Sequence, residues 1–203
     1  LTTDSRIWGG LNFKLGLLDQ VDLQTIVPIH VDQRTKSSTP GQSQRKKGTG
    51  DLTTRLKINL WGNDGGRTAM AIIPFVTFPT GADQIGQERT TGGVVLPFAV
   101  ELKKGWSLGA QTEVDWVEDE GNGLDTQWFN TLTIGHAIVG NLAGYTEWAA
   151  RMHLDSGQPW EGQWNVGLTY AISSEIQLDG GCNFGITSSA PDANPFLGLS
   201  MRF

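Results

Sequence analysis

The end of the chain alternates strictly between apolar residues and polar or small ones. Reading back from the terminus, the apolar residues are Phe203, Met201, Leu199 and Leu197, and every residue between them is polar or small. Successive side chains of a β-strand point to opposite faces, so this segment predicts a strand with one apolar and one polar face. A closing strand of this kind is typical of bacterial outer-membrane barrels, in which one face meets lipid and the other a polar lumen.

The composition is compatible with a membrane protein that crosses the bilayer with strands. Among 203 residues there are 27 Gly, 8 Trp, 8 Phe and 1 Cys, and the hydrophobic content is 38%. No apolar run approaches the roughly 18 residues that a transmembrane helix needs. A spanning structure would then have to be a closed barrel, because only closure satisfies every backbone N–H and C=O in hydrocarbon. The single Cys excludes an internal disulfide, and the net charge of -6 argues against nucleic-acid binding.

Period-two runs recur along the chain at an average spacing of roughly 18 residues, which suits a strand of about 10 residues plus its connection. The run 68–78 is apolar on both faces, so its register is not set by the sequence. The predicted strands lie within 7–17, 21–31, 52–60, 68–78, 94–102, 106–116, 128–139, 142–154, 164–172, 176–186 and 196–203.

The connections between these runs alternate in length. Short ones are expected at 19–20, 63–66, 103–105, 140–141 and 173–174, and long ones near 33–50, 79–92, 118–126, 155–162 and 188–195. Outer-membrane barrels have short periplasmic turns and longer external loops. Asn-Asp-Gly-Gly and Gly-Asn supply the positive φ angles that tight turns require.

We therefore predict an all-β fold, a transmembrane antiparallel up-and-down β-barrel that forms a single domain over residues 1–203. Single-chain bacterial barrels have an even number of strands and periplasmic termini. Eleven strands are visible, so we expect about twelve, with one N-terminal strand missing from this chain. A soluble β-sandwich is the less favoured alternative, because it leaves the alternation of turns and loops unexplained.

Charged side chains collect on the predicted polar face, and both signs are present. Charges removed from bulk water persist only when they are paired or solvated. One interpretation is an ion-lined constriction that selects solutes. The other is a salt-bridged plug that fills a narrow barrel. The candidate lumen residues are Lys14, Arg55, Lys57, Glu101, Glu113, Asp115, Glu147, Arg151, His153, Asp179 and Arg202.

Large aromatic residues alternate on the opposite, apolar face. Trp and Tyr near strand ends anchor a barrel at headgroup depth, and we prefer this interpretation to an aromatic ligand track. The predicted girdle residues are Trp106, Trp116, Trp128, Trp148, Trp164 and Tyr170. We expect Phe203 to act as an assembly signal, with the barrel-assembly machinery as a partner of the C-terminal strand.

The long connections carry two charged clusters. The basic stretch 34–47 could contact lipopolysaccharide phosphates through charge-assisted hydrogen bonds, or it is a flexible, solvated loop. The acidic run 118–120 contains hard oxygen ligands that suit calcium, but three adjacent carboxylates lack the spacing of a cage, so we expect a solvated tip. We expect no metal and no cofactor.

The sequence does not indicate an enzyme. The histidines His30, His136 and His153 are scattered over different predicted strands, and the predicted lumen position of His153 does not suit a lipid substrate. No Gly-x-Ser-x-Gly sequence, paired histidine metal motif or phosphate loop occurs. We therefore expect no catalytic residues.

Several segments resemble the outer-membrane family named for the meta-pathway of phenol degradation. They are 176–181 with 183–187, Ala190-Pro191-Asp192 and 196–203 at the end of the chain, and earlier 50–52 and 74–81. The resemblance covers most of residues 5–203 and is most specific at the C-terminus. It implies a barrel of about twelve strands that passes aromatic or other hydrophobic compounds, and a further N-terminal strand.

The resulting functional prediction is a passive channel in the outer membrane of a Gram-negative bacterium, for small hydrophobic or aromatic compounds. The alternative is a non-conducting barrel whose outer loops bind a partner protein. A lipid-acting enzyme is disfavoured by the missing catalytic residues. Outer-membrane lipid is the expected surrounding, and no nucleic acid is expected.

Overall fold

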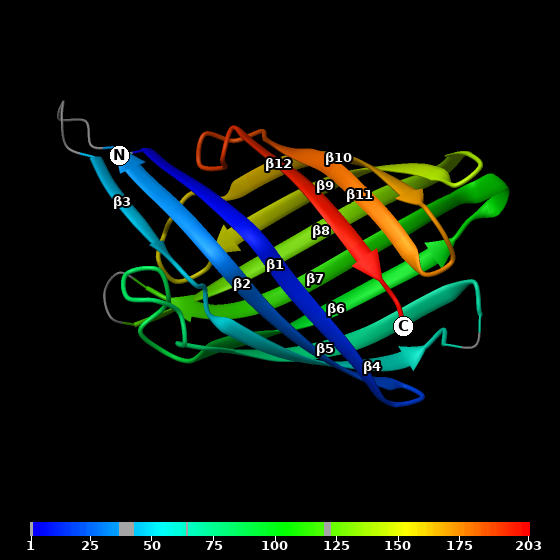
Figure 1. The fold of residues 1–203 in the computed structure, drawn as a ribbon, viewed down its shortest axis with the longest axis horizontal. Helices are drawn as coiled ribbons and strands as arrows, with labels where there is room; N and C mark the ends of the chain where they lie inside the picture. Colours follow the sequence, from blue (N-terminus) through cyan, green and yellow to red (C-terminus); the bar gives the residue numbers. More distant parts are fainter. Residues whose placement is uncertain (1, 37–42, 64, 120–122) are drawn as a thin grey trace. The chain divides into compact units, whose positions relative to one another are not determined.

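The computed structural model describes all residues except 1, 37–42, 64 and 120–122. Twelve strands make one antiparallel sheet with the order β1-β2-β4-β5-β6-β7-β8-β9-β10-β11-β12, and β3 pairs with β2 beside this path (Figure 1). The first strands are β1 (Thr2–Leu18), β2 (Val21–Lys36), β3 (Ser43–Gly48), β4 (Leu52–Trp61), β5 (Thr68–Phe78) and β6 (Thr91–Glu101). The others are β7 (Trp106–Glu118), β8 (Leu124–Val139), β9 (Leu142–His153), β10 (Glu161–Ala171), β11 (Ile176–Gly185) and β12 (Ala193–Met201).

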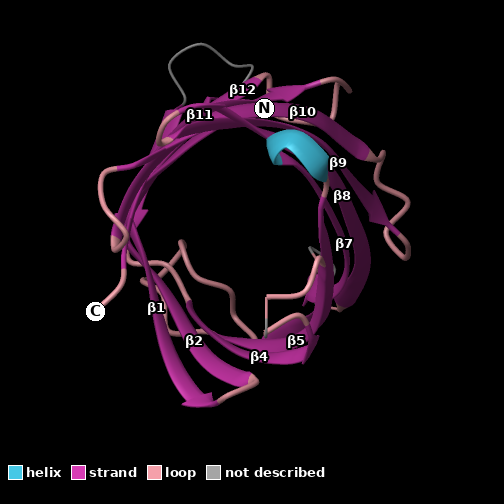
Figure 2. Ribbon diagram, turned by 90° about the vertical axis from the view of Figure 1, so that its right-hand side faces the viewer, coloured by secondary structure: helices cyan, strands magenta, loops and turns pink. Residues whose placement is uncertain are grey.

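This up-and-down order confirms the predicted fold class. Each of the eleven predicted runs corresponds to one strand of the path. Because every strand neighbours the next one along the path, the connections stay local and no crossover is needed. A 3-10 turn, Lys103–Gly105, joins β6 to β7 and is the helical segment drawn in cyan in Figure 2. In the described part of the chain, no helix is long and apolar enough to cross a membrane.

The predicted tight turns are confirmed by their backbone angles. Gly65 and Gly140 have φ values of 80° and 56°, in the left-handed region that favours glycine. At Gly140 the chain reverses between β8 and β9, where Val139 pairs with Leu142. A glycine at this position lets a two-residue connection join two strands without strain.

The prediction of a long loop over 33–50 is wrong in part. β2 continues to Lys36, and β3 pairs with it from Ser43↔Lys36 to Gly48↔Val31, while residues 37–42 lie outside the described part. Both strands of this hairpin extension are polar, so no hydrophobic alternation marks them. Arg45 instead joins the two strands by donating from Nε to Asp32 Oδ1 at 2.8 Å. The connection near 118–126 is also shorter than predicted, because β7 ends at Glu118 and β8 begins at Leu124.

Two compact units can be distinguished within the chain. The first comprises Leu1–Ile58, Ile73–Val94 and Trp116–Leu124, and the second Asn59–Ile72, Val95–Asp115 and Asp125–Phe203. In both, large apolar side chains are exposed, such as Phe13 at 62% in the first unit and Leu168 at 52% in the second. A soluble domain would bury such side chains, so this face is built for an apolar surrounding.

Candidate functional site: the polar face of the sheet

We define the polar face of each unit as the face opposite its exposed apolar side chains. In β10, for example, Trp164, Val166 and Leu168 are 48%, 40% and 52% exposed, whereas Asn165 between them is 6% exposed. Gly167 is also buried. Polar side chains are therefore covered and apolar ones exposed, which is the reverse of the usual arrangement in a soluble protein.

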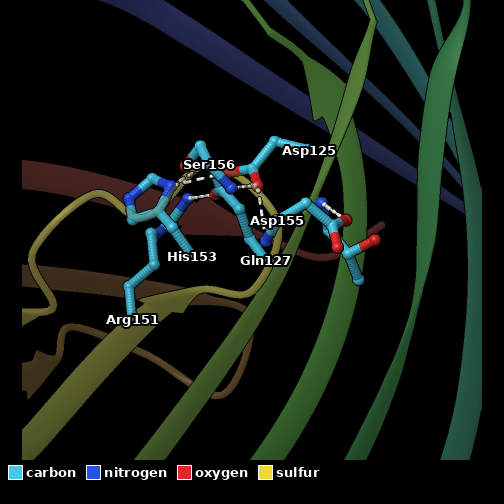
Figure 3. Close-up of polar contacts among 7 residues, drawn as sticks. Asp125, Gln127, Arg151, His153, Asp155 and Ser156 are labelled. Carbon is cyan, nitrogen blue, oxygen red and sulfur yellow. Dashed lines mark hydrogen bonds and ion pairs between the residues drawn. The ribbon is translucent and has the colours of Figure 1, made fainter.

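In the second unit, a loop-end cluster lies where β8 begins and β9 ends. The cluster consists of Asp125, Gln127, Arg151, His153, Asp155 and Ser156 (Figure 3). His153 Nδ1 lies 2.8 Å from Asp125 Oδ2, and Arg151 Nη1 donates to Gln127 Oε1 at 2.8 Å. Asp125 is 4% exposed and Gln127 8%. Because an unpaired charge that is buried away from water lowers the stability of the fold, a carboxylate as buried as that of Asp125 requires such partners.

The same cluster fixes the connection between β9 and β10. Asp125 Oδ1 accepts hydrogen bonds from the backbone N–H groups of Asp155 (3.3 Å) and Ser156 (3.1 Å). Asp155 Oδ2 in turn accepts the backbone N–H of Thr126 at 3.0 Å. Asp125 of β8 thus binds the backbone that follows β9, and Asp155 binds the backbone of β8. The first residues after β9 are therefore attached to β8.

Arg151 also packs on an aromatic ring of the polar face. Its guanidinium carbon lies 4.9 Å from the centroid of the Phe129 ring, and the two residues oppose each other across β8 and β9. A guanidinium over a ring face is stabilised by the ring quadrupole. Arg151 is therefore held by both Phe129 and Gln127 rather than projecting freely.

Glu147 is the centre of a second polar contact, four residues before Arg151 on β9. Thr133 Oγ1 donates to its Oε2 at 2.6 Å, and Asn165 Nδ2 donates to its Oε1 at 2.9 Å. The strand register sets this geometry, because Glu147 pairs with Thr133 on one side and with Asn165 on the other. On β7, Gln111 Nε2 donates to Glu113 Oε2 at 2.8 Å. With Asp125 of β8, carboxylates of three strands are thus oriented by neighbouring polar groups.

The polar face of the first unit carries basic groups held in a similar way. The Arg55 guanidinium lies 5.3 Å from the centroid of the Phe75 ring, and Thr53 and Thr77 share a hydrogen bond of 2.9 Å. These two contacts settle the register of β5 that the sequence left open, since they place its odd-numbered residues on the polar face. Lys14 Nζ pairs with Asp22 Oδ2 at 2.9 Å.

A carboxylate also anchors the connection between β5 and β6. Asp51 accepts the backbone N–H groups of Gly81 at 2.8 Å and Gln87 at 2.7 Å. Glu118, from the acidic run considered as a calcium ligand, accepts the backbone N–H of Glu88 at 2.8 Å. These carboxylates organise the loop 79–90 from two sides. Among the described residues, no group of three or more side chains could hold a metal ion.

The remaining predicted lumen residues are not all at comparable positions. Lys57 opposes Asp22 across β4 and β2, and Asp115 is 6% exposed. Asp179 opposes Gly198 in the middle of β11. Glu101 is exposed at the last position of β6. Arg202 lies beyond β12, where its Nε donates to Glu175 Oε2 at 2.8 Å, with its side chain 75% exposed.

The Arg202 contact belongs to the turn before β11 rather than to the centre of the face. The hydrogen bond from the Arg202 guanidinium lowers the pKa of Glu175, although partial desolvation acts in the opposite direction. The same pairing raises the pKa of Arg202. Both groups are therefore charged at neutral pH and form an exposed ion pair at the turn end.

The six aromatic residues predicted as a girdle lie on the apolar face, with exposures from 39% for Trp148 to 49% for Tyr170. Trp148 and Trp164 oppose each other across β9 and β10. Trp128 Nε1 donates to Thr112 Oγ1 at 2.8 Å, and Trp106 stacks on His136 with ring centroids 4.2 Å apart. Phe203 is fully exposed after the end of β12.

Several polar-face residues were missed from the sequence. Asp125 and Gln127 fall before the predicted start of their strand, although their alternation with Trp128 was a signal that the strand begins earlier. Asn165 is polar and alternates with Trp164 and Val166, which marks its face. No sequence signal separates Phe129 from a lipid-facing residue, because hydrophobicity alone assigns a phenylalanine to the apolar face.

Comparisons with known proteins agree with this architecture. A family model described as "Putative MetA-pathway of phenol degradation" matches residues 2–203. The structure is similar to that of the NanC porin, with a TM-score of 0.58 and 10% identity, covering 95% of this chain and 97% of the porin. It is also similar to an outer membrane channel from Pseudomonas putida F1, with a TM-score of 0.62 and 15% identity, covering 93% of this chain and 77% of that one. No curated protein sequence matches the chain.

These likenesses show the fold. The protein has the antiparallel up-and-down fold of the β-barrel class, as the alternation along its strands predicted.

Proposed function

The chain belongs to the family described as "Putative MetA-pathway of phenol degradation", and we propose that it is an outer-membrane channel for the passive passage of small hydrophobic or aromatic compounds. The observation that carries the proposal is the covered polar face opposite an exposed apolar one. Such a sheet can face lipid on one side and a solute path on the other. The porin and channel folds that it resembles support the same role.

In this proposal the polar face lines the path. The oriented carboxylates of the second unit, such as Asp125 and Glu147, then make its polar face mainly acidic, with Arg151 as a basic exception. Rings of one charge sign bias ion passage toward the opposite sign. Asp125, Glu147 and Arg151 each already have a hydrogen-bond partner on the polar face, so their side chains stay in place when a solute passes.

Conductance of the refolded protein in a planar bilayer tests the proposal. We expect discrete open steps and, in a KCl gradient, a reversal potential that changes when Arg151→Gln removes a positive charge from the polar face. Lys104→Gln is the matched control, because Lys104 lies in the exposed turn between β6 and β7. Heat-modifiable migration on a detergent gel shows that the protein is folded. A folded protein that gives no open steps would overturn the channel and favour the non-conducting barrel whose outer loops bind a partner protein.

A further inference from the structure

Two aromatic residues lie on the polar face of the second unit in a single row across four strands. Tyr145 of β9 opposes Gly167 of β10, Gly167 opposes Gly181 of β11, and Gly181 opposes Phe196 of β12. Both ends of the row therefore carry a ring, and its two central positions have no side chain. Since Gly167 belongs to the polar alternation of β10, the rings share the face of Asn165 and Glu147.

The rings lie over the glycines. A Cβ added at Gly167 would meet the Tyr145 ring atoms at 2.5 Å, and a Cβ added at Gly181 would lie 2.9 Å from Phe196 Cζ. A larger residue at Gly167 would displace the Tyr145 ring, and one at Gly181 would meet the backbone of Val166 and Gly167 as well as the Phe196 ring. The Cε1, Cζ and Oη atoms of Tyr145 are equally far from the Cβ added at Gly167, so one face of this ring lies against the backbone and the other is left for the solute side. We call Tyr145, Gly167, Gly181 and Phe196 the aromatic shelf.

Acidic groups flank the shelf in the rows on either side. Toward the loops, Glu147 lies two residues from Tyr145 and is oriented by Thr133 and Asn165. Toward the turns, Asp179 lies two residues from Gly181. A cation is attracted both to carboxylates and to the face of an aromatic ring. The shelf thus combines a planar apolar surface with negative charge on both sides.

An unsatisfied acceptor lies beside the shelf. Within the described residues, Asn165 Oδ1 is buried and has no hydrogen-bond donor, although the side-chain Nδ2 is fixed by Glu147. Buried acceptors in native structures nearly always receive a hydrogen bond, so we expect water or a bound solute to donate one to Asn165 Oδ1.

From these features we propose that the aromatic shelf is a binding site for small aromatic solutes that carry a protonated amine. The ring of the solute stacks on Tyr145 and Phe196, while its ammonium group lies toward Glu147 or Asp179. The proposal rests on the channel function proposed above, and it places the solute contact on the polar face rather than on the tryptophans of the apolar face.

Benzylamine is the probe for this site. Added to a conducting bilayer, it should block the current more strongly than cyclohexylmethylamine, which has the same charge without a ring face, and more strongly than benzoate, which has the ring with the opposite charge. Tyr145→Leu should weaken benzylamine block about fivefold, the scale of one aromatic–aromatic pair. Tyr145→Phe should leave it unchanged. Phe184→Leu is the matched control, because Phe184 is 44% exposed on the apolar face.

A second measurement does not depend on conductance. Saturation-transfer NMR on the detergent-refolded protein should detect benzylamine on the wild type, and Gly167→Ala should reduce the signal, because its Cβ displaces the Tyr145 ring. Open steps with equal block by benzylamine and cyclohexylmethylamine would overturn the shelf and leave the channel intact. Benzylamine binding that is lost in Tyr145→Leu but occurs without any open steps would retain the shelf and overturn the channel. Binding that is unaffected by Tyr145→Leu and Gly167→Ala would overturn the shelf.

Discussion

Glu147 offers the sharpest test of the polar network, because one carboxylate holds the side chains of two neighbouring strands. Glu147→Leu removes the acceptor of Thr133 Oγ1 and that of Asn165 Nδ2. The threonine hydroxyl can rotate toward another acceptor, but Asn165 is 6% exposed and its Oδ1 already lacks a donor. Leaving a buried amide unpaired costs about 1–3 kcal/mol. The free energy of unfolding should therefore fall by about 2 kcal/mol.

Urea unfolding of the micelle-refolded protein, followed by tryptophan fluorescence, measures this loss. With an m value of about 2 kcal/mol/M, the midpoint should fall by about 1 M. Glu147→Gln retains an amide oxygen that can accept from Asn165, so it should cost less. Glu161→Leu is the matched control, since Glu161 also faces the polar side of β10 and the described structure shows no side-chain hydrogen bond for it.

A double-mutant cycle decides whether the loss arises from the pair. Once Glu147 is leucine, Asn165→Leu should cost less than it does in the wild type, because the unpaired amide is removed. The reasoning would be refuted by a midpoint for Glu147→Leu within about 0.2 M of the wild type. It would equally be refuted if the two single losses simply added.

Three further outcomes are expected. Asp51→Ala removes the acceptor of two backbone N–H groups in the loop 79–90, so limited trypsin digestion should cut this loop several times faster than in the wild type, with unchanged rates elsewhere. Trp128→Phe should lower the free energy of unfolding by about 1 kcal/mol, read from the urea midpoint, because it deletes an indole hydrogen bond on the apolar face. Arg202 lowers the pKa of Glu175. Their pairing therefore stabilises the folded protein at pH values above the ordinary carboxyl pKa, and this stabilisation is lost as the pH falls through the lowered pKa. Arg202→Gln should flatten the dependence of the urea midpoint on pH below about 5.

Alternation along the strands predicted the face of most residues because lipid and a polar path impose opposite demands on neighbouring side chains. It failed where an aromatic residue serves the polar face. Phe75 and Phe129 lie beneath the guanidinium groups of Arg55 and Arg151, so each belongs to a polar contact despite its hydrophobicity. Phe75 is thus one of the residues, with Ala69, Ala71 and Ile73, that made the run 68–78 look apolar on both faces. The extension of β2 was missed for the opposite reason, since both of its faces are polar.

The polar contacts of Glu147 depend on the register between β8 and β9. The length of the turn between these strands, taken alone, would have assigned this register wrongly. The turn at Gly140 pairs Val139 with Leu142, and counting onward from this pair would place Trp148 opposite Thr133. A register shift between Ala137 and Val139 instead brings Glu147 to Thr133 and Trp148 to Leu132. A one-residue slip exchanges the two faces of a strand, so without the shift an apolar tryptophan would enter the polar network.

The alternation contains the information needed to infer this shift. The large apolar residues exposed in the middle of β8, Leu132 and Ile134, and Trp148 of β9 occupy even positions, so the numbers of paired residues must add to an even sum if like faces are to meet. The pair Val139 and Leu142 gives an odd sum, 139 + 142 = 281, whereas Thr133 and Glu147 give 133 + 147 = 280. One strand must therefore absorb a single extra residue between the turn and the network, which is the function of a β-bulge. Face pattern and turn length together specify the register that neither specifies alone, and the hydrogen bonds of Glu147 follow from that register.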